Sequence, residues 1–265
     1  MKYIIGFICV IFALGTKANL LISPTRLNFD SKDRVQEVML VNTTSKERTY
    51  RIEWSEKKAL ALGGYEELAE DDDSVARLSP YMRFSPRQVR LAPGERQTIK
   101  IQLRRKADMQ ELEYRSHLKF VALPPEDELP PEDSNVDGMR MSLDMLLSYS
   151  IPVVYHPVEP LTSVSIDDFA LSTRADDAID LYLQLTRRKT NSAYGRIEVY
   201  TKVDGKQKRI GLLNNVAIFK ELDNAQKSVL IPNYRQYGEL DELTIKYIGE
   251  KEYKGQTLAE RTVRL

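Results

Sequence analysis

Residues 139–155 read MRMSLDMLLSYSIPVVY, and every odd-numbered position in this run is apolar. The even-numbered positions include Arg140, Ser142 and Asp144. A two-residue period places one face of a β-strand against apolar surroundings and the other in water. At about 3.3 Å per residue the run would span roughly 55 Å, whereas an ordinary strand has about 5–6 residues. The sequence therefore predicts a β-protein in which part of this strand extends beyond the core of its own domain.

Pro152 lies inside this run and has no N–H group to donate to a neighbouring strand. We therefore expect it at a sheet edge, at a bulge, or where the strand changes partners. A long edge strand with an apolar face pairs readily with other chains. Two interpretations stay open. The run is either a long core strand with methionine as filler, or a strand that remains available to pair with another chain.

The rest of the chain predicts further short strands joined by tight turns. Alternating apolar residues occupy positions 50–54, 99–103, 179–185 and 243–247, and no long segment has a helical period. Pro93-Gly94 suits a type II turn, and Asp204-Gly205 is a strong hairpin signal. Glu66–Ser74 and Pro124–Gly138 are predicted to be irregular and acidic. Many short strands indicate an all-β fold of antiparallel sandwiches.

The length of 265 residues favours two domains. Two prolines within His156–Pro160 predict the end of a strand and a stiff connection. We therefore divide the chain into an N-terminal sandwich, residues 19–157, and a C-terminal sandwich, residues 158–265.

Residues 1–18 have the order of a secretory signal peptide. Lys2 precedes a 12-residue apolar run, and small residues at Thr16 and Ala18 predict cleavage after Ala18. The run is shorter than the roughly 20 residues that a membrane-spanning helix needs, so no integral span is expected. Cleavage would also remove Cys9, the one cysteine of the chain. The sequence therefore predicts an exported protein without disulfides.

The composition argues against several classes of function. Basic and acidic residues both number 39, so the net charge is zero and nucleic acid is not an expected partner. The chain has two histidines, His117 and His156, and no motif for a metal site, a phosphate loop or a nucleophilic serine. We therefore expect neither an enzyme nor a bound cofactor or metal. The paired carboxylates of a glycosidase leave no motif, so a carbohydrate-active β-protein stays an alternative.

Five short segments together resemble the PapD-like periplasmic chaperones of the chaperone–usher pathway. In order, they read SPTRL at 23–27, VMLVN at 38–42, LAPGE at 91–95, YRSHL at 114–118 with LPP at 123–125, and SIPVV at 150–154. The resemblance implies two immunoglobulin-like domains behind a signal peptide, a periplasmic location and no catalysis. It implies that the partners are pilin-like fimbrial subunits, which such a chaperone hands to an outer-membrane usher.

The resemblance also implies which residues bind the subunit. One strand of the first domain is lent to the subunit, which places this role on Met139, Met141, Leu143, Met145 and Leu147. A basic pair anchors the carboxylate at the subunit's C-terminus. Arg26 matches the arginine of that pair, but Pro152 stands at the lysine position, as fits the divergent branch often called archaic or alternative.

A replacement for the missing lysine is predicted from strand pairing. If residues 114–123 pair antiparallel with 139–155, the start of the first lies beside the end of the second. Arg115 could then reach the cleft between the domains and serve as the second anchor. An ordinary structural role for Arg115 is the competing interpretation.

Three further possibilities stay open at this stage. The chain could itself be a structural or adhesive component of a surface fibre, although the strand pattern begins within a few residues of Ala18 and leaves no spare N-terminal donor segment. It could be the carbohydrate-active protein mentioned above. As a chaperone without a subunit, it could cap its own free edge by forming a dimer.

Overall fold

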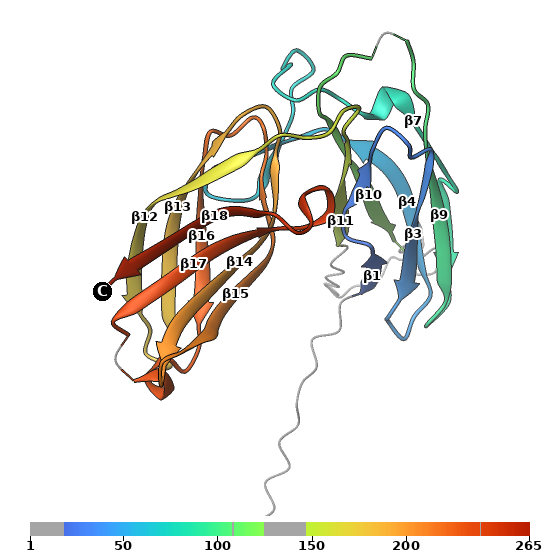
Figure 1. The fold of residues 1–265 in the computed structure, drawn as a ribbon. Coiled ribbons are helices and arrows are strands. Elements are labelled where there is room, and N and C mark those ends of the chain that lie inside the picture. The colour runs from blue at the N-terminus through green and yellow to red at the C-terminus, as the bar shows by residue number, and fades with distance from the viewer. Residues whose placement is uncertain (1–18, 108, 125–146, 239) are drawn as a thin grey trace, which may run out of the picture.

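The computed structural model describes residues 19–107, 109–124, 147–238 and 240–265. These residues form two β-sandwiches that lie side by side (Figure 1). Each sandwich has its own hydrophobic core: the first core ends at Tyr155 and the second begins at Val164. The predicted boundary at 157/158 lies within the connection between them. The prediction of an all-β chain built from two sandwiches is confirmed.

The N-terminal sandwich packs a four-stranded sheet against a five-stranded sheet. The first contains, in spatial order, β1 (Leu20–Ser23), β3 (Val35–Asn42), β9 (Arg96–Leu103) and β7 (Met82–Ser85). The second contains β2 (Leu27–Phe29), β11 (Ser148–Tyr155), β10 (Tyr114–Leu123), β4 (Arg48–Ser55) and β8 (Gln88–Leu91). In β9, Ile99 and Ile101 are fully buried while Lys100 is exposed, as a two-residue period predicts.

The C-terminal sandwich is built in the same way from seven strands. One sheet contains β12 (Ser163–Thr173), β13 (Ile179–Arg188) and β16 (Asn224–Ile231). The other contains β15 (Lys206–Ile218), β14 (Ala193–Val203), β17 (Glu242–Gly249) and β18 (Thr257–Arg264). Asp204 and Gly205 join β14 to β15 with φ values of 51° and 74°. Positive φ at both central residues is what a two-residue type I′ hairpin requires, so the predicted hairpin is confirmed.

Helical structure is limited to short 3-10 turns in the described residues: η1 (Ser79–Tyr81), η3 (Tyr234–Tyr237) and η4 (Lys251–Tyr253). Within this part of the chain, no helix has the length and apolar composition that crossing a bilayer requires.

Strand β11 has two different edges. Along its whole length it pairs antiparallel with β10. On its other side, β2 pairs with it in parallel from Val153 to Tyr155, and no described strand pairs there with Ser148–Pro152. Pro152 therefore stands where the second partner begins, which confirms its predicted position at an edge or a change of partners.

A small hairpin joins the two sandwiches. It consists of β5 (Lys57–Ala59) and β6 (Tyr65–Glu67). The turn between them reaches the C-terminal sandwich, where the backbone N–H of Gln226 donates to the carbonyl of Ala61 at 3.0 Å (light blue in Figure 1). The prediction that residues 66–74 are irregular is wrong at its start, because Glu66 and Glu67 pair with β5.

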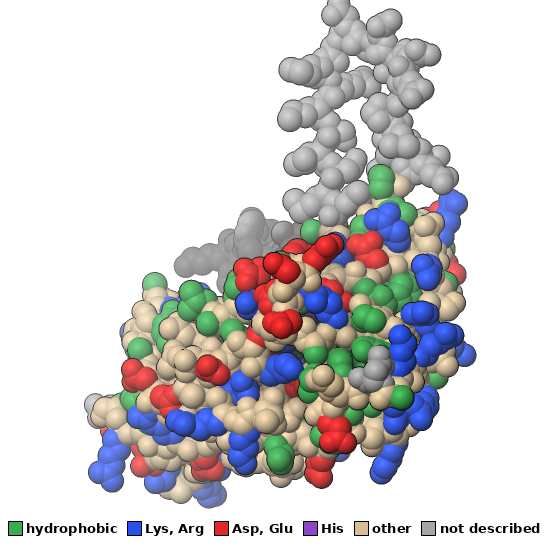
Figure 2. Space-filling view, turned by 90° about the horizontal axis from the view of Figure 1, so that it is seen from above, with side chains coloured by type: hydrophobic (Ala, Val, Ile, Leu, Met, Phe, Trp, Pro, Cys, Tyr) green, Lys and Arg blue, Asp and Glu red, His purple; other side chains and the backbone are tan. Residues whose placement is uncertain are grey.

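Charges are unevenly distributed over the surface although the net charge is zero. In the view of Figure 2, acidic side chains gather near the centre and basic side chains along the outer side of the N-terminal sandwich. Neither sign covers the whole of this face.

Candidate functional site

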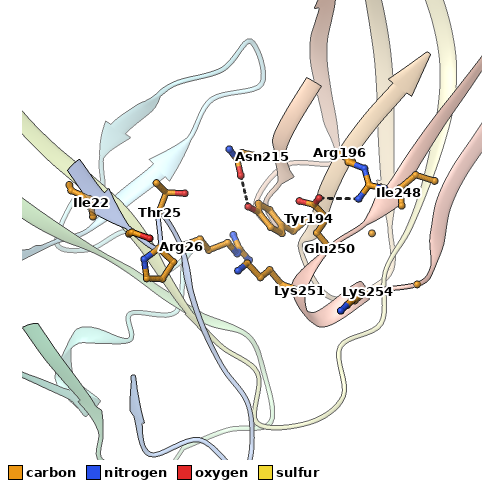
Figure 3. Close-up of a pocket in the computed structure, with 14 residues that line it drawn as sticks. Ile22, Thr25, Arg26, Tyr194, Arg196, Asn215, Ile248, Glu250, Lys251 and Lys254 are labelled. Carbon is orange, nitrogen blue, oxygen red and sulfur yellow. Dashed lines mark hydrogen bonds and ion pairs between the residues drawn. The ribbon is translucent and has the colours of Figure 1, made fainter. Parts of the chain in front are cut away.

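A cleft of about 750 Å³ lies between the two sandwiches (Figure 3). One wall is the segment from Ile22 to Arg26, which joins β1 to β2. The opposite wall belongs to the C-terminal sandwich and includes Tyr194 and Asn215. Four cationic side chains line the cleft, namely Arg26, Arg196, Lys251 and Lys254, together with one acid, Glu250. Arg196 pairs with Glu250 at 3.1 Å, so cations outnumber acids in the lining of the cleft.

Arg26, the predicted anchor, lies buried at this cleft and contacts both domains. Its Nη2 pairs with Glu252 Oε1 at 3.1 Å and its Nε donates to Asn28 Oδ1 at 2.7 Å. Its guanidinium carbon lies 4.3 Å from the centre of the Tyr194 ring, a cation–π contact. Its Nη1 has no hydrogen-bond partner among the described residues. The two N–H groups on Nη1 of Arg26 thus have no acceptor in the part of the chain that the structure describes.

Arg115, the predicted second anchor, is also at the domain interface. The predicted antiparallel pairing is confirmed, because Arg115 lies opposite Val154 of β11. Its Nη2 and Nη1 bind the two carboxylate oxygens of Glu221 at 2.6 and 3.1 Å, and both side chains are almost fully buried. The guanidinium also lies 3.9 Å from the centre of the Phe219 ring. Arg115 therefore already holds a carboxylate of its own chain, and its role as subunit anchor stays a prediction.

Glu113 forms a further buried contact between the sandwiches. Its Oε2 lies 3.1 Å from His156 Nε2 and accepts the backbone N–H of Ser192 at 2.8 Å. Its Oε1 accepts the hydroxyl of Ser192. Burial alone would raise the pKa of Glu113, but the hydrogen bonds and charge of His156 and the bonds from Ser192 outweigh it and lower the pKa to about 2. Glu113 is therefore ionised at neutral pH and holds the domains together.

His117 lies on β10 opposite Pro152 and is 1% exposed. Neither ring nitrogen has a hydrogen-bond partner among the described residues, and the ring meets Tyr65 edge-on, with centroids 4.8 Å apart. Burial, followed by the positive charges of Arg115, Lys57 and Arg26, lowers the pKa of His117 from 6.5 to about 3. His117 is thus a neutral side chain surrounded by three cations.

Lys57 was not singled out by the sequence. It lies on β5, is half-buried, and its ammonium donates to Ser150 Oγ of β11 at 3.1 Å. No ion pair joins it to a carboxylate within the described residues, whereas its neighbour Lys58 pairs with Asp72 at 3.3 Å. Gly63-Gly64 is a hairpin signal that could have indicated the β5–β6 pair. The contact with β11, however, joins residues 93 positions apart.

The proposed donor residues lie mostly outside the described part of the chain. Met139, Met141, Leu143 and Met145 fall within residues 125–146, about which the structure gives no description. Leu147 is described and is 43% exposed. In β11, the odd-numbered Ile151, Val153 and Tyr155 face the core. Leu147 therefore precedes a strand whose odd positions are buried from Ile151 onward and partly buried at Tyr149.

No group of three or more potential metal-binding His, Cys, Asp or Glu residues occurs in the described ranges. Within that part of the chain, His117 and His156 belong to the domain interface, as described above, and not to a ligand set.

Comparisons with known proteins point to one family. A sequence profile of the family described as pili and flagellar-assembly chaperone, PapD N-terminal domain, matches residues 19–160. A search of curated proteins returned no match. Solved structures that match include an Acinetobacter baumannii complex of the chaperone CsuC with the tip subunit CsuE, from archaic chaperone–usher pili. That structure has 12% sequence identity and a TM-score of 0.45, with 93% of this chain and 97% of that chain covered.

Two other matching structures have the same degree of likeness. One is the Salmonella enterica pilin SafA in complex with the chaperone SafB, with 14% identity, a TM-score of 0.43 and coverage of 93% of this chain and 96% of that chain. The other is the E. coli chaperone DraB, with 13% identity, a TM-score of 0.43 and the same two coverages.

Proposed function

Because the chain belongs to the PapD-like family of pili and flagellar-assembly chaperones, we propose that it stabilises a pilin-like subunit by lending it the strand that ends in β11. The chaperone role follows from the family. The strand donation, the identity of the partner and the route of delivery are our proposal.

The free edge of β11 is the observation that carries this proposal. From Ser148 to Pro152, β11 pairs with β10 on one side and with no described strand on the other. A strand of the subunit would form backbone hydrogen bonds along this edge, and apolar side chains of the lent strand would fill pockets of the subunit. The apolar odd positions continue upstream through Leu147 toward Met139. Each buried Leu or Met would contribute roughly 1.5–3 kcal/mol before the cost of association.

Strand β2 would limit how far the incoming strand can extend. It occupies the edge of β11 from Val153 onward, and Arg26 directly precedes its first residue, Leu27. A strand that pairs with the free edge would therefore end beside Arg26. Arginine binds a carboxylate well because its planar fork offers two parallel donors. We propose Arg26 as one anchor of the subunit's terminal carboxylate, and Arg115 stays a candidate for the second.

The cellular setting is part of the same proposal. We expect export through the signal peptide at residues 1–18, action in the periplasm and delivery of the subunit to an outer-membrane usher. Assembly by exchange of one strand for another needs no nucleotide and no catalytic residue. A dimer that covers the free edge in the absence of a subunit also stays a prediction.

The test is co-expression of the full chain with each secreted protein encoded beside its gene. We expect one of these proteins to be soluble only when the chain is co-expressed, and to co-purify with it. Serine at Leu143, Met145 and Leu147 should abolish this capture, since the apolar face is lost. A matched control places alanine at Ser142 and Asp144, on the opposite face of the same run.

Three results would count against the proposal. The first is capture of the subunit by the variant with three serine substitutions. The second is loss of capture in the alanine control but not in the serine variant. The third is that every candidate subunit is as stable without the chain as with it. Turnover of a sugar by the purified protein would instead favour the carbohydrate-active alternative.

A further inference from the structure

Lys57 has the position of an anchor, and the described residues supply it with no carboxylate. Its ammonium lies 3.1 Å from Ser150 Oγ, two residues before the end of the free edge of β11. Its charge lowers the pKa of His117, which lies directly opposite Pro152. Lys57 therefore brings a positive charge to the position where Pro152 offers none.

The backbone of Lys57 is held in place by the interface between the sandwiches. Arg115 Nη2 donates to the carbonyl of Lys57 at 2.9 Å. Two residues later, the N–H of Ala59 donates to Glu221 Oε1 at 2.9 Å, and this is the same carboxylate that binds Arg115. The buried ion pair thus fixes β5, and β5 directs the lysine side chain toward β11.

The other cations near this edge are already paired with carboxylates. Arg115 binds Glu221 and Arg26 binds Glu252, both in buried contacts. Lys119, which lies opposite Ser150, pairs with Glu53 at 3.5 Å. Among these four cations, Lys57 is the one for which the described residues supply a neutral hydroxyl instead of an acid. A half-buried ammonium in this position favours a carboxylate ligand.

We propose that Lys57 is the positioning residue for the terminal carboxylate of the incoming strand, supplied by the β5–β6 hairpin in place of a lysine on β11. This assignment rests on the proposed function and adds the residue that fixes where the strand stops. Arg115 then acts indirectly, because it holds the backbone of Lys57 while Glu221 neutralises its own charge.

The test uses the full chain and the subunit recovered by co-purification. The probes are two synthetic peptides with the last 15 residues of that subunit, one with a free C-terminal carboxylate and one with a C-terminal amide. Lys57→Met keeps the length of the side chain and removes its charge. Lys58→Met is the matched control on the same hairpin, and Lys57→Arg restores the charge.

We expect Lys57→Met to weaken binding of the free-carboxylate peptide by about tenfold, or about 1.4 kcal/mol. Lys57→Arg should recover most of the affinity, and Lys58→Met should retain it. The amidated peptide should bind Lys57→Met and the unaltered chain equally weakly. Equal binding of both peptides by the unaltered chain, or an unchanged affinity in Lys57→Met, would overturn the role of Lys57 and leave strand donation intact. If neither the subunit nor the free-carboxylate peptide binds the unaltered chain, the proposed function itself fails.

Discussion

The buried ion pair between the sandwiches and the free edge of β11 lie a few residues apart and use charge in opposite ways. In the ion pair, the side chains of Arg115 and Glu221 are at most 2% exposed and bind each other through two contacts. At the edge, Lys57 is half-buried and touches a neutral serine. One region has matched charges within the chain, whereas the other carries a charge without an acidic partner in the described residues.

This contrast separates what holds the chain together from what the chain can bind. A buried pair loses much of its Coulomb energy to desolvation, so its main effect is to make a missing partner very costly. Such a pair suits a fixed arrangement of two sandwiches. A partly exposed cation has paid little of that desolvation cost and is free to bind an anion from outside. The following substitutions test the contrast, from the largest expected effect to the smallest.

Glu221→Ala should give the largest loss of stability. The substitution leaves the Arg115 guanidinium buried without its carboxylate. An unpaired buried charge is expected to lower the unfolding free energy by about 3–5 kcal/mol. Urea unfolding at pH 7 measures this directly. Asp223→Ala is a suitable control, because Asp223 is a nearby acid that is 91% exposed. Equal, small effects of both substitutions would show that the buried pair of Arg115 and Glu221 does not hold the two sandwiches together.

Glu113→Gln should lower the unfolding free energy by about 3 kcal/mol at pH 7. This is the contribution of a carboxyl group whose pKa is 4.5 in the unfolded chain and about 2 in the folded protein. The lowered pKa contributes stability above pH 4.5, and this contribution is lost as the pH falls toward 2. The variant and the unaltered chain should therefore converge in acid. A difference in unfolding free energy that stays constant from pH 7 to pH 3 would contradict the ionised state of Glu113.

His117→Leu should change the pH dependence of stability. The pKa of His117 is lowered from 6.5 to about 3 in the folded state, so the unfolded chain binds a proton first as the pH falls below 6.5. The unaltered chain should lose about 2 kcal/mol through this residue between pH 7 and pH 5. The variant should lack that part of the loss. Parallel stability curves for the two proteins would show that the three surrounding cations do not act on His117 as described.

Lys57→Met should have the smallest effect on stability, below about 0.5 kcal/mol, because the lysine has no acidic partner to lose in the described residues. Thermal unfolding of Lys57→Met and Lys58→Met at equal concentration provides the measurement. A loss as large as that of Glu221→Ala would mean that Lys57 is as important for stability as the buried ion pair, and the contrast between the two regions would disappear.

Local pattern was enough to predict the architecture. Alternation in segments such as Ile99–Leu103 gave the strands, and Asp204-Gly205 gave a hairpin of the right type. The antiparallel pairing of β10 with β11 also followed, which brought Arg115 to the interface. These features depend on neighbouring residues, whose spacing is visible in a single sequence.

The charge pairing of the site could not be predicted in the same way. Arg115 and Glu221 are 106 positions apart, and Lys57 and Ser150 are 93 apart. No periodicity relates residues in different sandwiches. Strand pairing brought Arg115 to the domain interface, but the sequence could not show that Glu221 neutralises it there. Lys57 was missed for the same reason, because its role depends on where the β5–β6 hairpin packs.

The distribution of interface charges has a consequence for fragments of this protein. The N-terminal sandwich supplies Arg26 and Arg115, while the C-terminal sandwich supplies Glu252 and Glu221. A cut in the connection between β11 and β12 would leave two polypeptides, one exposing the unpaired arginines and the other exposing the unpaired glutamates. Mixed together, they are expected to recombine as a heterodimer that forms more slowly as the ionic strength rises, so each half would act as a specific ligand for the other.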